Sequence, residues 1–321
     1  MKKDFAVGLD MGGTNIRTAA VSKTGDVLLM LRGPAHAKGS ARETVANISA
    51  QILALEAAAL RRGLGRAIAI GVAVPGPLNV RTGVIYAAPH VKAWRSFPLR
   101  RELERVLKRQ VIVENDANAW ALGEYWRGAA RGRKNVVLLT LGTGVGGGLI
   151  VDGKIVHGRS GMAAELGHVT VEPNGMPCDC GNRGCLEAYA SASGLCGLLK
   201  KRLQLEESAL PAKYLDSGGE FSARKITNAA KMGDRVAIEI FETAGNYLGI
   251  AVASFINIFN PELVVIGGGV AGALSLMRPT MTREVKARAF RAAVVQTRIV
   301  RAALGAEGGV VGAAFAALNA D

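Results

Sequence analysis

The sequence predicts an α/β fold made of two related lobes with a cleft between them. Two segments share one plan: an apolar strand, a glycine-rich turn, a second strand, a tight turn and a third strand. The copies are FAVGLDMGGTNIRTAAVSKTGDVLLM (residues 5–30) and NVVLLTLGTGVGGGLIVDGKIVHG (135–158). Between and after them, strand patterns alternate with helix patterns, which is typical of α/β proteins. The duplication predicts two lobes, and ligands commonly bind in a concave site between such parts.

In the first half, residues 41–62 predict an amphipathic helix, because Val45, Ile48, Ile52 and Leu55 recur at helical spacing. The segments that follow are read as the strand AIAIGVAVPG (67–76), a helix beginning near PLRRELERVLKR (98–109), the strand VIVEND (111–116) and the helix NAWALGEYWRG (118–128). The alternation continues the α/β pattern.

In the second half, residues 234–260 predict a long helix that ends before Pro261, because proline cannot continue a helix. The strand ELVVIGGGVA (262–271) then enters a third glycine turn. No low-complexity linker interrupts the chain, so closely coupled lobes are expected. We expect a smaller N-terminal lobe (1–115), a larger C-terminal lobe (116–307), and a helix at about 308–320 that packs back on the first lobe.

The composition, 49% hydrophobic and 21% charged over 321 residues, is that of a globular protein. No uninterrupted apolar stretch approaches the roughly 18 residues of a membrane helix, and the N-terminal apolar run is too short for a signal peptide. A cytoplasmic protein without membrane contact is therefore expected. The residues behind the net charge of +14 are scattered, aromatic residues make up 5%, and no helix-turn-helix pattern is recognisable within the first residues. Solvated basic faces are therefore expected rather than specific nucleic-acid binding.

Three glycine-rich turns, at residues 9–15, 141–148 and 266–271, each follow an apolar strand. Glycine lets backbone amides approach a phosphate, and the hydroxyls of Thr14 and Thr143 can donate to it. The turns fit neither the Walker pattern nor the dinucleotide pattern, whose glycines lead into a helix. One such turn is more often a structural hairpin. Three in a duplicated architecture favour a nucleoside triphosphate held between the lobes.

Acidic residues lie where such a site would need them. Asp10 directly precedes the first turn and is placed to hold Mg²⁺ on phosphates, with a turn-capping role as the alternative. Asn115 and Asp116 end a strand, where ligand sites of α/β folds lie, although Asp116 could equally cap the next helix. Further polar candidates are Glu165, His168 and Glu187. Such groups can bind a polyol, while one carboxylate accepts a proton from an attacking hydroxyl.

The stretch HVTVEPNGMPCDCGNRGC (168–185) holds three of the four cysteines and a histidine. In a reducing compartment, clustered cysteines bind metal more often than they form disulfides. One nitrogen and three sulfurs make the ligand set of a closed structural zinc site, with free or redox-active thiols as the alternative. The ligands would be His168, Cys178, Cys180 and Cys185. Cys196 lies outside the pattern and is expected in the core.

The motifs DMGGT, ENDANA, LGTGVGGG, ELGH, CDCGNRGCLE and VVIGGGV follow one another over essentially the whole chain. In this order they resemble the sugar kinases of the ROK (repressor, open reading frame, kinase) family, and within it the bacterial glucokinases. The pairing of ELGH with C-x-C-G-x-x-G-C-x-E is the most specific part. The resemblance implies a two-lobed, actin-like and hexokinase-like fold (ribonuclease H-like, duplicated), in agreement with the duplication.

The resemblance also implies roles for the candidate residues. Asp116 matches the catalytic base. The implied sugar ligands are Asn115, Glu165, His168 and Glu187, with Gly76 in the VPGP loop that closes over the sugar. The implied magnesium and phosphate sites comprise Asp10, Gly12, Gly13, Thr14, Thr143 and Gly144, with Gly268 near the adenosine. The resemblance strengthens the zinc interpretation, in which His168 offers its second ring nitrogen to the sugar.

The implied activity is transfer of phosphate from Mg·ATP to the 6-hydroxyl of a hexose, with glucose preferred, by a homodimer or homotetramer. Kinases for N-acetylglucosamine, N-acetylmannosamine, fructose or mannose are the alternative, and polyphosphate could replace ATP. A sugar-sensing repressor is a further alternative. Its family members carry a DNA-binding module ahead of the kinase-like part, whereas here the first phosphate turn begins within a dozen residues of Met1.

Two positions depart from the family's glucokinases, which often have asparagine in place of His90 and aspartate in place of Asn79. If His90 faces the sugar, the hexose preference changes; if it lies on a surface loop, nothing follows. Trp94 fits the glucokinase pattern better than that of the hexosamine kinases.

Overall fold

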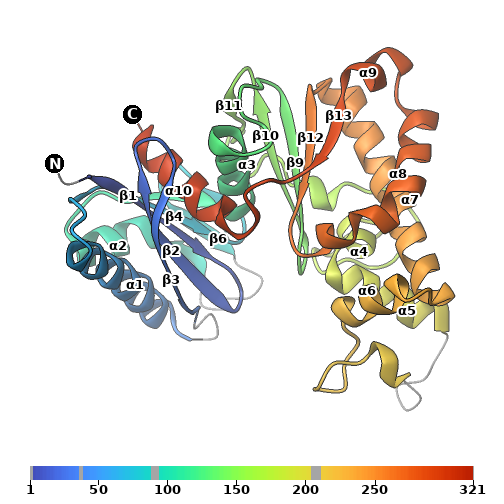
Figure 1. The fold of residues 1–321 in the computed structure, drawn as a ribbon, viewed down its shortest axis with the longest axis horizontal. Coiled ribbons are helices and arrows are strands. Elements are labelled where there is room, and N and C mark those ends of the chain that lie inside the picture. The colour runs from blue at the N-terminus through green and yellow to red at the C-terminus, as the bar shows by residue number, and fades with distance from the viewer. Residues whose placement is uncertain (1–2, 36–38, 88–93, 204–210, 321) are drawn as a thin grey trace. The chain divides into compact units, whose positions relative to one another are not determined.

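The computed structural model describes residues 3–35, 39–87, 94–203 and 211–320. These residues form two compact units (Figure 1). The first unit comprises Met1–Lys134, Gly148–Ala164 and Ala302–Asp321, and the second comprises Asn135–Gly147 and Glu165–Arg301. His90, whose role was left open, lies outside the described residues.

The first unit is built on a five-stranded sheet in the order β3-β2-β1-β4-β8. Its strands are β1 (Phe5–Met11), β2 (Asn15–Ser22), β3 (Val27–Pro34), β4 (Ala67–Val74) and β8 (Ile112–Asn115). The first three strands pair antiparallel, and β4 and β8 continue the sheet in parallel with β1. A small antiparallel sheet adds β5 (Leu78–Asn79), β6 (Val84–Ala87) and β7 (Arg95–Pro98).

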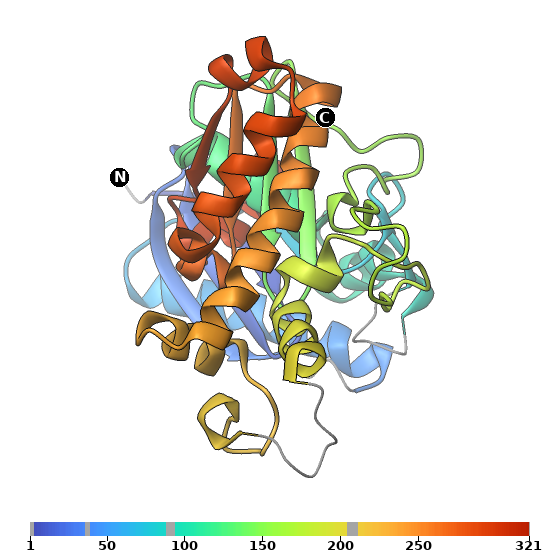
Figure 2. The same cartoon turned by 90° about the vertical axis from the view of Figure 1, so that its right-hand side faces the viewer.

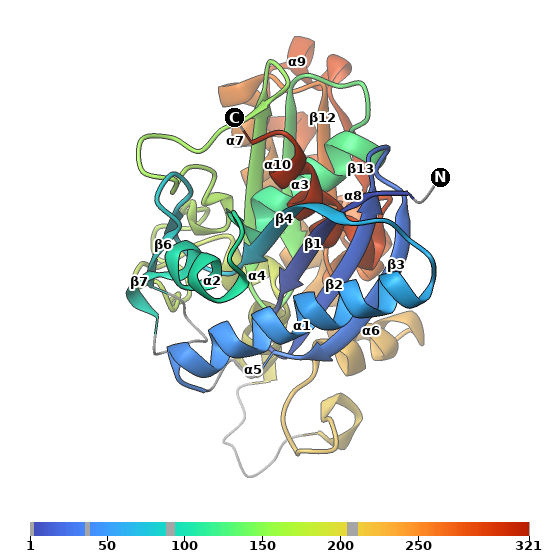
Figure 3. The same ribbon diagram turned by 90° about the vertical axis from the view of Figure 1, so that its left-hand side faces the viewer.

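Helices cover both faces of the first sheet. One face packs against α1 (Ala41–Arg61) and α2 (Leu99–Leu107), and Figure 3 shows α1 running across the strands. The other face packs against α3 (Asp116–Arg127) and α10 (Gly308–Leu318). The residues of α1 form a helix because Ser40 and Glu43 make a capping box and the apolar positions recur at helical spacing.

Glycine allows α10 to lie unusually close to its neighbours. A Cβ on Gly8 of β1 would collide with the carbonyl oxygen of Val310, and a Cβ on Gly312 would collide with that of Ala119 in α3. Because α3 packs on α10 in this way, it groups with the first unit, whereas the predicted lobe boundary lies before α3.

The second five-stranded sheet has the order β11-β10-β9-β12-β13. Its strands are β9 (Val136–Leu141), β10 (Val145–Val151), β11 (Lys154–Ile155), β12 (Leu263–Gly267) and β13 (Arg298–Arg301). This order repeats that of the first sheet. The three strands of the repeated unit, β11, β10 and β9, lie side by side, and β12 and β13 extend the sheet in parallel next to β9. The predicted duplication and the α/β fold class are confirmed.

The helices of the second unit are α4 (Glu187–Ala190), α5 (Ala192–Leu203), α6 (Ala223–Lys231), α7 (Arg235–Phe259), α8 (Leu274–Arg288) and α9 (Arg291–Gln296). Short 3-10 helices span Leu166–His168, Ala212–Tyr214 and Val270–Ala273, and a further one in the first unit spans Gly305–Glu307. The long helices α7 and α8 pack side by side (Figure 2).

Helix α7 begins at an Asp234 N-cap and ends at Asn260, whose φ of 42° is left-handed. It is the one helix among the described residues that is long and apolar enough to cross a membrane by length and composition. More than half of its apolar window, 56%, is buried inside the protein, and buried core helices commonly have this composition.

Candidate active site and metal-binding cluster

The first glycine turn joins β1 to β2 and follows the buried Asp10. The turn closes with a hydrogen bond of 2.9 Å from the backbone N of Gly12 to the carbonyl oxygen of Asn15, while Gly13 and Thr14 are exposed. Asp10 is 5% exposed, and its Oδ2 lies 3.4 Å from the Arg17 guanidinium. Burial raises the pKa of Asp10, and Arg17 partly offsets the rise. An exposed turn beside one buried carboxylate suits a ligand that carries both a cation and phosphates.

Close packing shapes the surroundings of Asp10. Gly309, in the first turn of α10, lies so near that a Cβ there would come within 2.5 Å of the Asp10 Cγ. Only glycine fits at this point without displacing the carboxylate. The N-terminal end of α10 therefore lies beside Asp10, where the helix dipole favours negative charge.

The second candidate group lies at the carboxyl end of β8. Asn115 is the N-cap of α3: its Oδ1 accepts from the backbone N of Ala117 at 2.9 Å and of Asn118 at 3.1 Å. The alternative in which Asp116 caps the helix is wrong, because Asp116 is the first helical residue. The Asp116 Oδ1 accepts from the Asn115 Nδ2 at 3.1 Å and from the backbone N of Ala117 at 2.9 Å.

The VPGP loop reaches the same place. Val74 of β4 pairs with Asn115 of β8, so Gly76, two residues later, lies beside the Asn115 side chain. The Asn115 Nδ2 donates to the carbonyl oxygen of Gly76 at 3.4 Å, and the φ of Gly76 is 95°, which favours glycine. The first unit thus brings together three of the predicted sugar-site residues: Gly76, Asn115 and Asp116.

The remaining predicted sugar ligands meet within the second unit. Burial raises the pKa of Glu165. The neighbouring Glu187 carboxylate adds to this rise and His168 opposes it, so the three groups interact electrostatically. The Glu187 Oε2 accepts from the backbone N of Val145 at 2.8 Å. A Cβ on Gly144 would come within 2.2 Å of this same oxygen, so glycine at that position leaves the Glu187 carboxylate undisplaced.

The second and third glycine turns also lie side by side. Strands β9 and β12 pair in parallel, and Gly268 follows β12 with a φ of 88° against the backbone of Leu141. The carbonyl oxygen of Thr143 accepts from the Ser193 hydroxyl at 3.0 Å. Thr143, Gly144 and Gly268 therefore share one end of the second sheet.

The predicted metal ligands converge on one point. One ligand atom from each of His168, Cys178, Cys180 and Cys185 lies within 4.8 Å of all the others. The Cys178 Sγ is 3.7 Å from the His168 Nδ1, and the Cys180 Sγ is 3.7 Å from the Cys185 Sγ. Tetrahedral bonds of about 2.0 to 2.3 Å to zinc separate the ligand atoms by about 3.5 to 3.8 Å. The donor set and the two distances of 3.7 Å therefore fit zinc.

The loop is shaped to bring these ligands together. Cys178 and Gly181 close a turn, and Gly181 and Gly184 have φ values of 92° and 70°. A Cβ on Gly184 would collide with the carbonyl oxygen of Glu172. Since Nδ1 of His168 faces the Cys178 sulfur, Nε2 lies on the opposite side of the ring. Cys196 is half-buried and donates to the carbonyl oxygen of Phe221 at 3.3 Å, apart from this cluster.

Asn79 and Trp94 serve the local structure. The Asn79 Oδ1 accepts from the backbone N of Arg81 at 3.0 Å and of Thr82 at 3.2 Å, which closes the turn between β5 and β6. Trp94 is 1% exposed and stacks on Phe97 with ring centroids 6.3 Å apart. The asparagine therefore has a turn-forming role that depends on no sugar.

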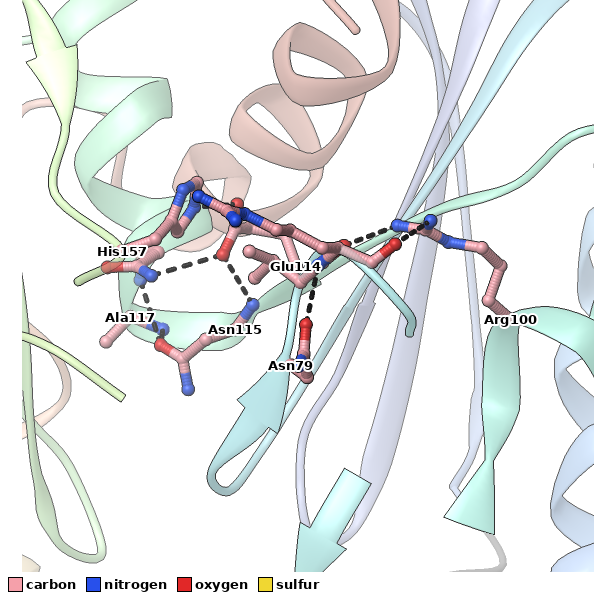
Figure 4. A network of polar contacts seen from close by, with 9 residues as sticks. Asn79, Arg100, Glu114, Asn115, Ala117 and His157 are labelled. Carbon is pink, nitrogen blue, oxygen red and sulfur yellow. Dashed lines mark hydrogen bonds and ion pairs between the residues drawn. The ribbon is translucent and has the colours of Figure 1, made fainter. Parts of the chain in front are cut away.

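The sequence interpretation missed one pair of residues. Glu114 is 4% exposed, and its Oε2 lies 2.7 Å from the His157 Nε2 (Figure 4). The residues are 43 positions apart, so no spacing rule links them. The sequence did contain one signal for this pair: a glutamate at the end of an otherwise apolar strand, since a buried carboxylate needs a polar or charged partner.

Comparison with known proteins decides the family. A sequence profile of the ROK family matches residues 6–320. The chain belongs to the ROK family. The glucokinase of Halalkalibacterium halodurans is 38% identical over 314 residues, which cover 97% of this chain and 94% of that protein.

Solved structures agree with this assignment. The ROK hexokinase from Thermus thermophilus is 34% identical with a TM-score of 0.81, covering 98% of this chain and 97% of that one. A ROK family glucokinase from Streptomyces griseus, solved in complex with glucose and AMPPNP, is 32% identical with a TM-score of 0.81, covering 98% and 99%. The predicted two-lobed sugar-kinase fold is confirmed.

The family also contains regulators. A putative xylose repressor from Caldicellulosiruptor sp. is 34% identical over 289 residues, covering 88% of this ROK chain and 70% of that protein. Family membership therefore fixes the fold but leaves the choice between kinase and regulator to the site residues.

Proposed function

We propose that this ROK protein is a glucokinase, which transfers the γ-phosphoryl group of ATP to the 6-hydroxyl of glucose. The observation that carries the proposal is the half-buried Asp116 carboxylate, held by Asn115 beside Gly76 at the carboxyl ends of two parallel strands. A kinase needs such a carboxylate to accept the hydroxyl proton, whereas a sugar sensor does not. The glucokinase from Halalkalibacterium halodurans and that from Streptomyces griseus agree with this choice by name.

Asp116 is the proposed general base. Its Oδ1 is engaged by Asn115 and by a backbone N–H, which orients the carboxylate without neutralising it. As the 6-hydroxyl attacks the γ-phosphorus in line, the carboxylate takes its proton. A general base typically contributes about 10² to 10⁴ in rate.

The proposed sugar ligands are Gly76 and Asn115 of the first unit and Glu165, His168 and Glu187 of the second. An amide, two carboxylates and an imidazole supply both donors and acceptors, as a polyol requires. The phosphates are assigned to backbone amides and hydroxyls of the glycine turns, through Gly12, Gly13, Thr14, Thr143 and Gly144, with Gly268 near the adenosine. Asp10 is assigned to Mg²⁺, which when bound offsets negative charge on the phosphates.

Zinc is the proposed structural metal of the Cys/His cluster. With four protein ligands, no coordination position stays open for water, so zinc would fix the loop and not activate a substrate. The loop carries His168 and lies beside Glu187, whose Oε1 is 3.6 Å from the Cys178 Sγ. Zinc binding is thereby proposed to order two sugar ligands. We further propose that the protein works in the cytoplasm, where thiols stay reduced. A homodimer or homotetramer is proposed from the resemblance to the family's glucokinases.

The test is coupled turnover with Mg·ATP against glucose, mannose, fructose, N-acetylglucosamine and N-acetylmannosamine. Saturable turnover with glucose, at least about tenfold above the other sugars in kcat/KM, supports the proposal. A higher kcat/KM for another sugar refutes the assigned substrate while leaving the family and fold unchanged. Sugar binding by calorimetry without any turnover would favour a sensor.

A further inference from the structure

Glu114 is a buried carboxylate that the proposed reaction does not use directly. It is 4% exposed and immediately precedes Asn115 at the end of β8. Its Oε1 accepts from the backbone N of Asn115 at 2.9 Å and from the Asn118 Nδ2 at 3.1 Å. One carboxylate oxygen thus holds both the residue before the proposed base and a residue on the first turn of α3.

The Asn118 side chain keeps its hydrogen bond to Glu114 although its own oxygen is left without a partner among the described residues. The side chain is 2% exposed, and its Oδ1 has no hydrogen-bond partner among the described residues. Turning the amide over would place Oδ1 against the Glu114 carboxylate, so the charge dictates the orientation. The local structure is therefore organised around the negative charge of Glu114.

The second carboxylate oxygen is held by His157. The His157 Nε2 lies 2.7 Å from the Glu114 Oε2, and the imidazole is 30% exposed, on the loop that follows β11 (Figure 4). A buried carboxylate without a charged partner is unfavourable, and the imidazolium supplies that partner. The chain of contacts runs from His157 to Glu114, then to Asn115 and Asp116.

We propose, on the basis of the proposed kinase function, that Glu114 and His157 form a positioning pair that fixes Asn115, and through it Asp116, for proton transfer. Neither residue touches the reacting atoms. The pair acts because Asn115 also orients the carboxylate of Asp116 and contacts the Gly76 loop. A small displacement of Asn115 moves the base and one wall of the sugar site together.

The pair is sensitive to pH. The hydrogen bond to Glu114 raises the pKa of His157, burial opposes it, and Arg81 is the other charged group that acts on the ring, lowering the pKa. The ion pair is fully formed below the unfolded-state pKa of about 6.5 and is lost as pH rises through the higher folded-state pKa. The neutral imidazole can still hydrogen-bond but no longer balances the Glu114 charge. We expect kcat to fall over this alkaline range.

The test compares His157→Ala and His157→Gln with wild type, using kcat, KM and their pH profiles. In His157→Ala, kcat is expected to fall at least about tenfold, because misplacement of a catalytic group is costly, while KM for ATP stays within about twofold. His157→Gln offers an amide donor that does not titrate. Because this amide is uncharged, like the neutral imidazole, the kcat of His157→Gln should lie near the alkaline limit of wild type and above that of His157→Ala, and it should lack the alkaline fall.

The matched control is Glu56→Gln, which breaks a bidentate ion pair to Arg109 in the same unit, at 2.7 and 2.9 Å. This variant should keep the wild-type pH profile. An unchanged kcat in His157→Ala, an alkaline fall that persists in His157→Gln, or loss of that fall in Glu56→Gln would each overturn the proposal.

A direct titration remains informative even if a variant is too unstable for kinetics. The chain has four histidines, so imidazole resonances in the NMR spectrum can be assigned by substitution. The His157 resonance should titrate above 6.5 in wild type and shift to lower pH in Glu114→Gln. An ordinary His157 titration in wild type overturns the proposal. If wild type turns over glucose and these results fail, only the positioning pair is refuted; if wild type has no kinase activity, the proposed function fails.

Discussion

Glu124 offers the sharpest test of how the first unit is stabilised. This residue of α3 is fully buried, and its carboxylate accepts from three backbone N–H groups: Ala129 at 2.7 Å, Ala303 at 3.0 Å and Leu304 at 2.8 Å. Ala303 and Leu304 follow the point at which the chain leaves the second unit and re-enters the first. Glu124 therefore holds the segment that re-enters the first unit against α3.

The expected cost of Glu124→Ala follows from these contacts. Hydrogen bonds to a charged group contribute about 1.5 to 3 kcal/mol each. Ala303 is exposed and Leu304 half-buried, so water can replace part of two of the three bonds. We expect a loss of about 3 to 5 kcal/mol in the free energy of unfolding, with the melting temperature falling by about 6 °C or more.

The assay is guanidinium unfolding of the first unit, followed by fluorescence of its tryptophans. The control is Glu102→Gln, which removes a surface pair with Arg105 at 3.0 Å and should cost less than about 1 kcal/mol. If Glu124→Ala stays within about 1 kcal/mol of wild type, the carboxylate does not hold the re-entry segment and the reasoning fails.

Three further predictions concern the site and the charge pairs. Asp116→Asn should lower kcat by at least about 10² while calorimetry shows nearly unchanged glucose affinity; turnover within a few-fold of wild type would remove Asp116 as the base. Stripping the metal with a strong chelator should weaken glucose binding, and unchanged affinity in protein shown by elemental analysis to be metal-free would contradict the coupling. Lys213, at 2.5 Å, lowers the pKa of Asp234 to about 2, with help from the backbone N of Ala237. The stabilisation by Asp234 should therefore be present above about pH 3.8 and lost as pH falls through 2, and acid unfolding of Asp234→Asn should lack that step.

The parts of the fold that repeat a local pattern could be predicted from the sequence. The helix expected over 41–62 spans Ala41–Arg61, and the one expected over 234–260 spans Arg235–Phe259. Both are long, periodic and capped, so local signals suffice. The predicted shared plan is likewise confirmed, because each sheet contains one three-strand unit: β1 to β3 in the first sheet and β9 to β11 in the second.

The detail of contacts between distant segments could not be predicted. The sequence predicts that a helix at about 308–320 packs on the first lobe, but the close approach of α10 to β1 and α3 depends on glycines such as Gly312, whose role appears only when the partner backbone is in place. The choice between Asn115 and Asp116 as the cap depends on the direction in which each side chain points. Two adjacent polar residues at a strand end carry no signal that distinguishes these roles.

Glu187 explains why the metal loop and a glycine turn occur together in one unit. One carboxylate oxygen accepts from the backbone N of Val145, in the strand that leaves the turn, and the other lies 3.6 Å from the Sγ of Cys178, a proposed zinc ligand. A Cβ on Gly144 would come within 2.2 Å of that first oxygen, so glycine at this position leaves the carboxylate in place. The carboxylate therefore contacts the glycine turn through one oxygen and the metal loop through the other. The cysteine cluster, although remote in sequence from the phosphate motifs, is thus in contact with the residue that shapes one of them.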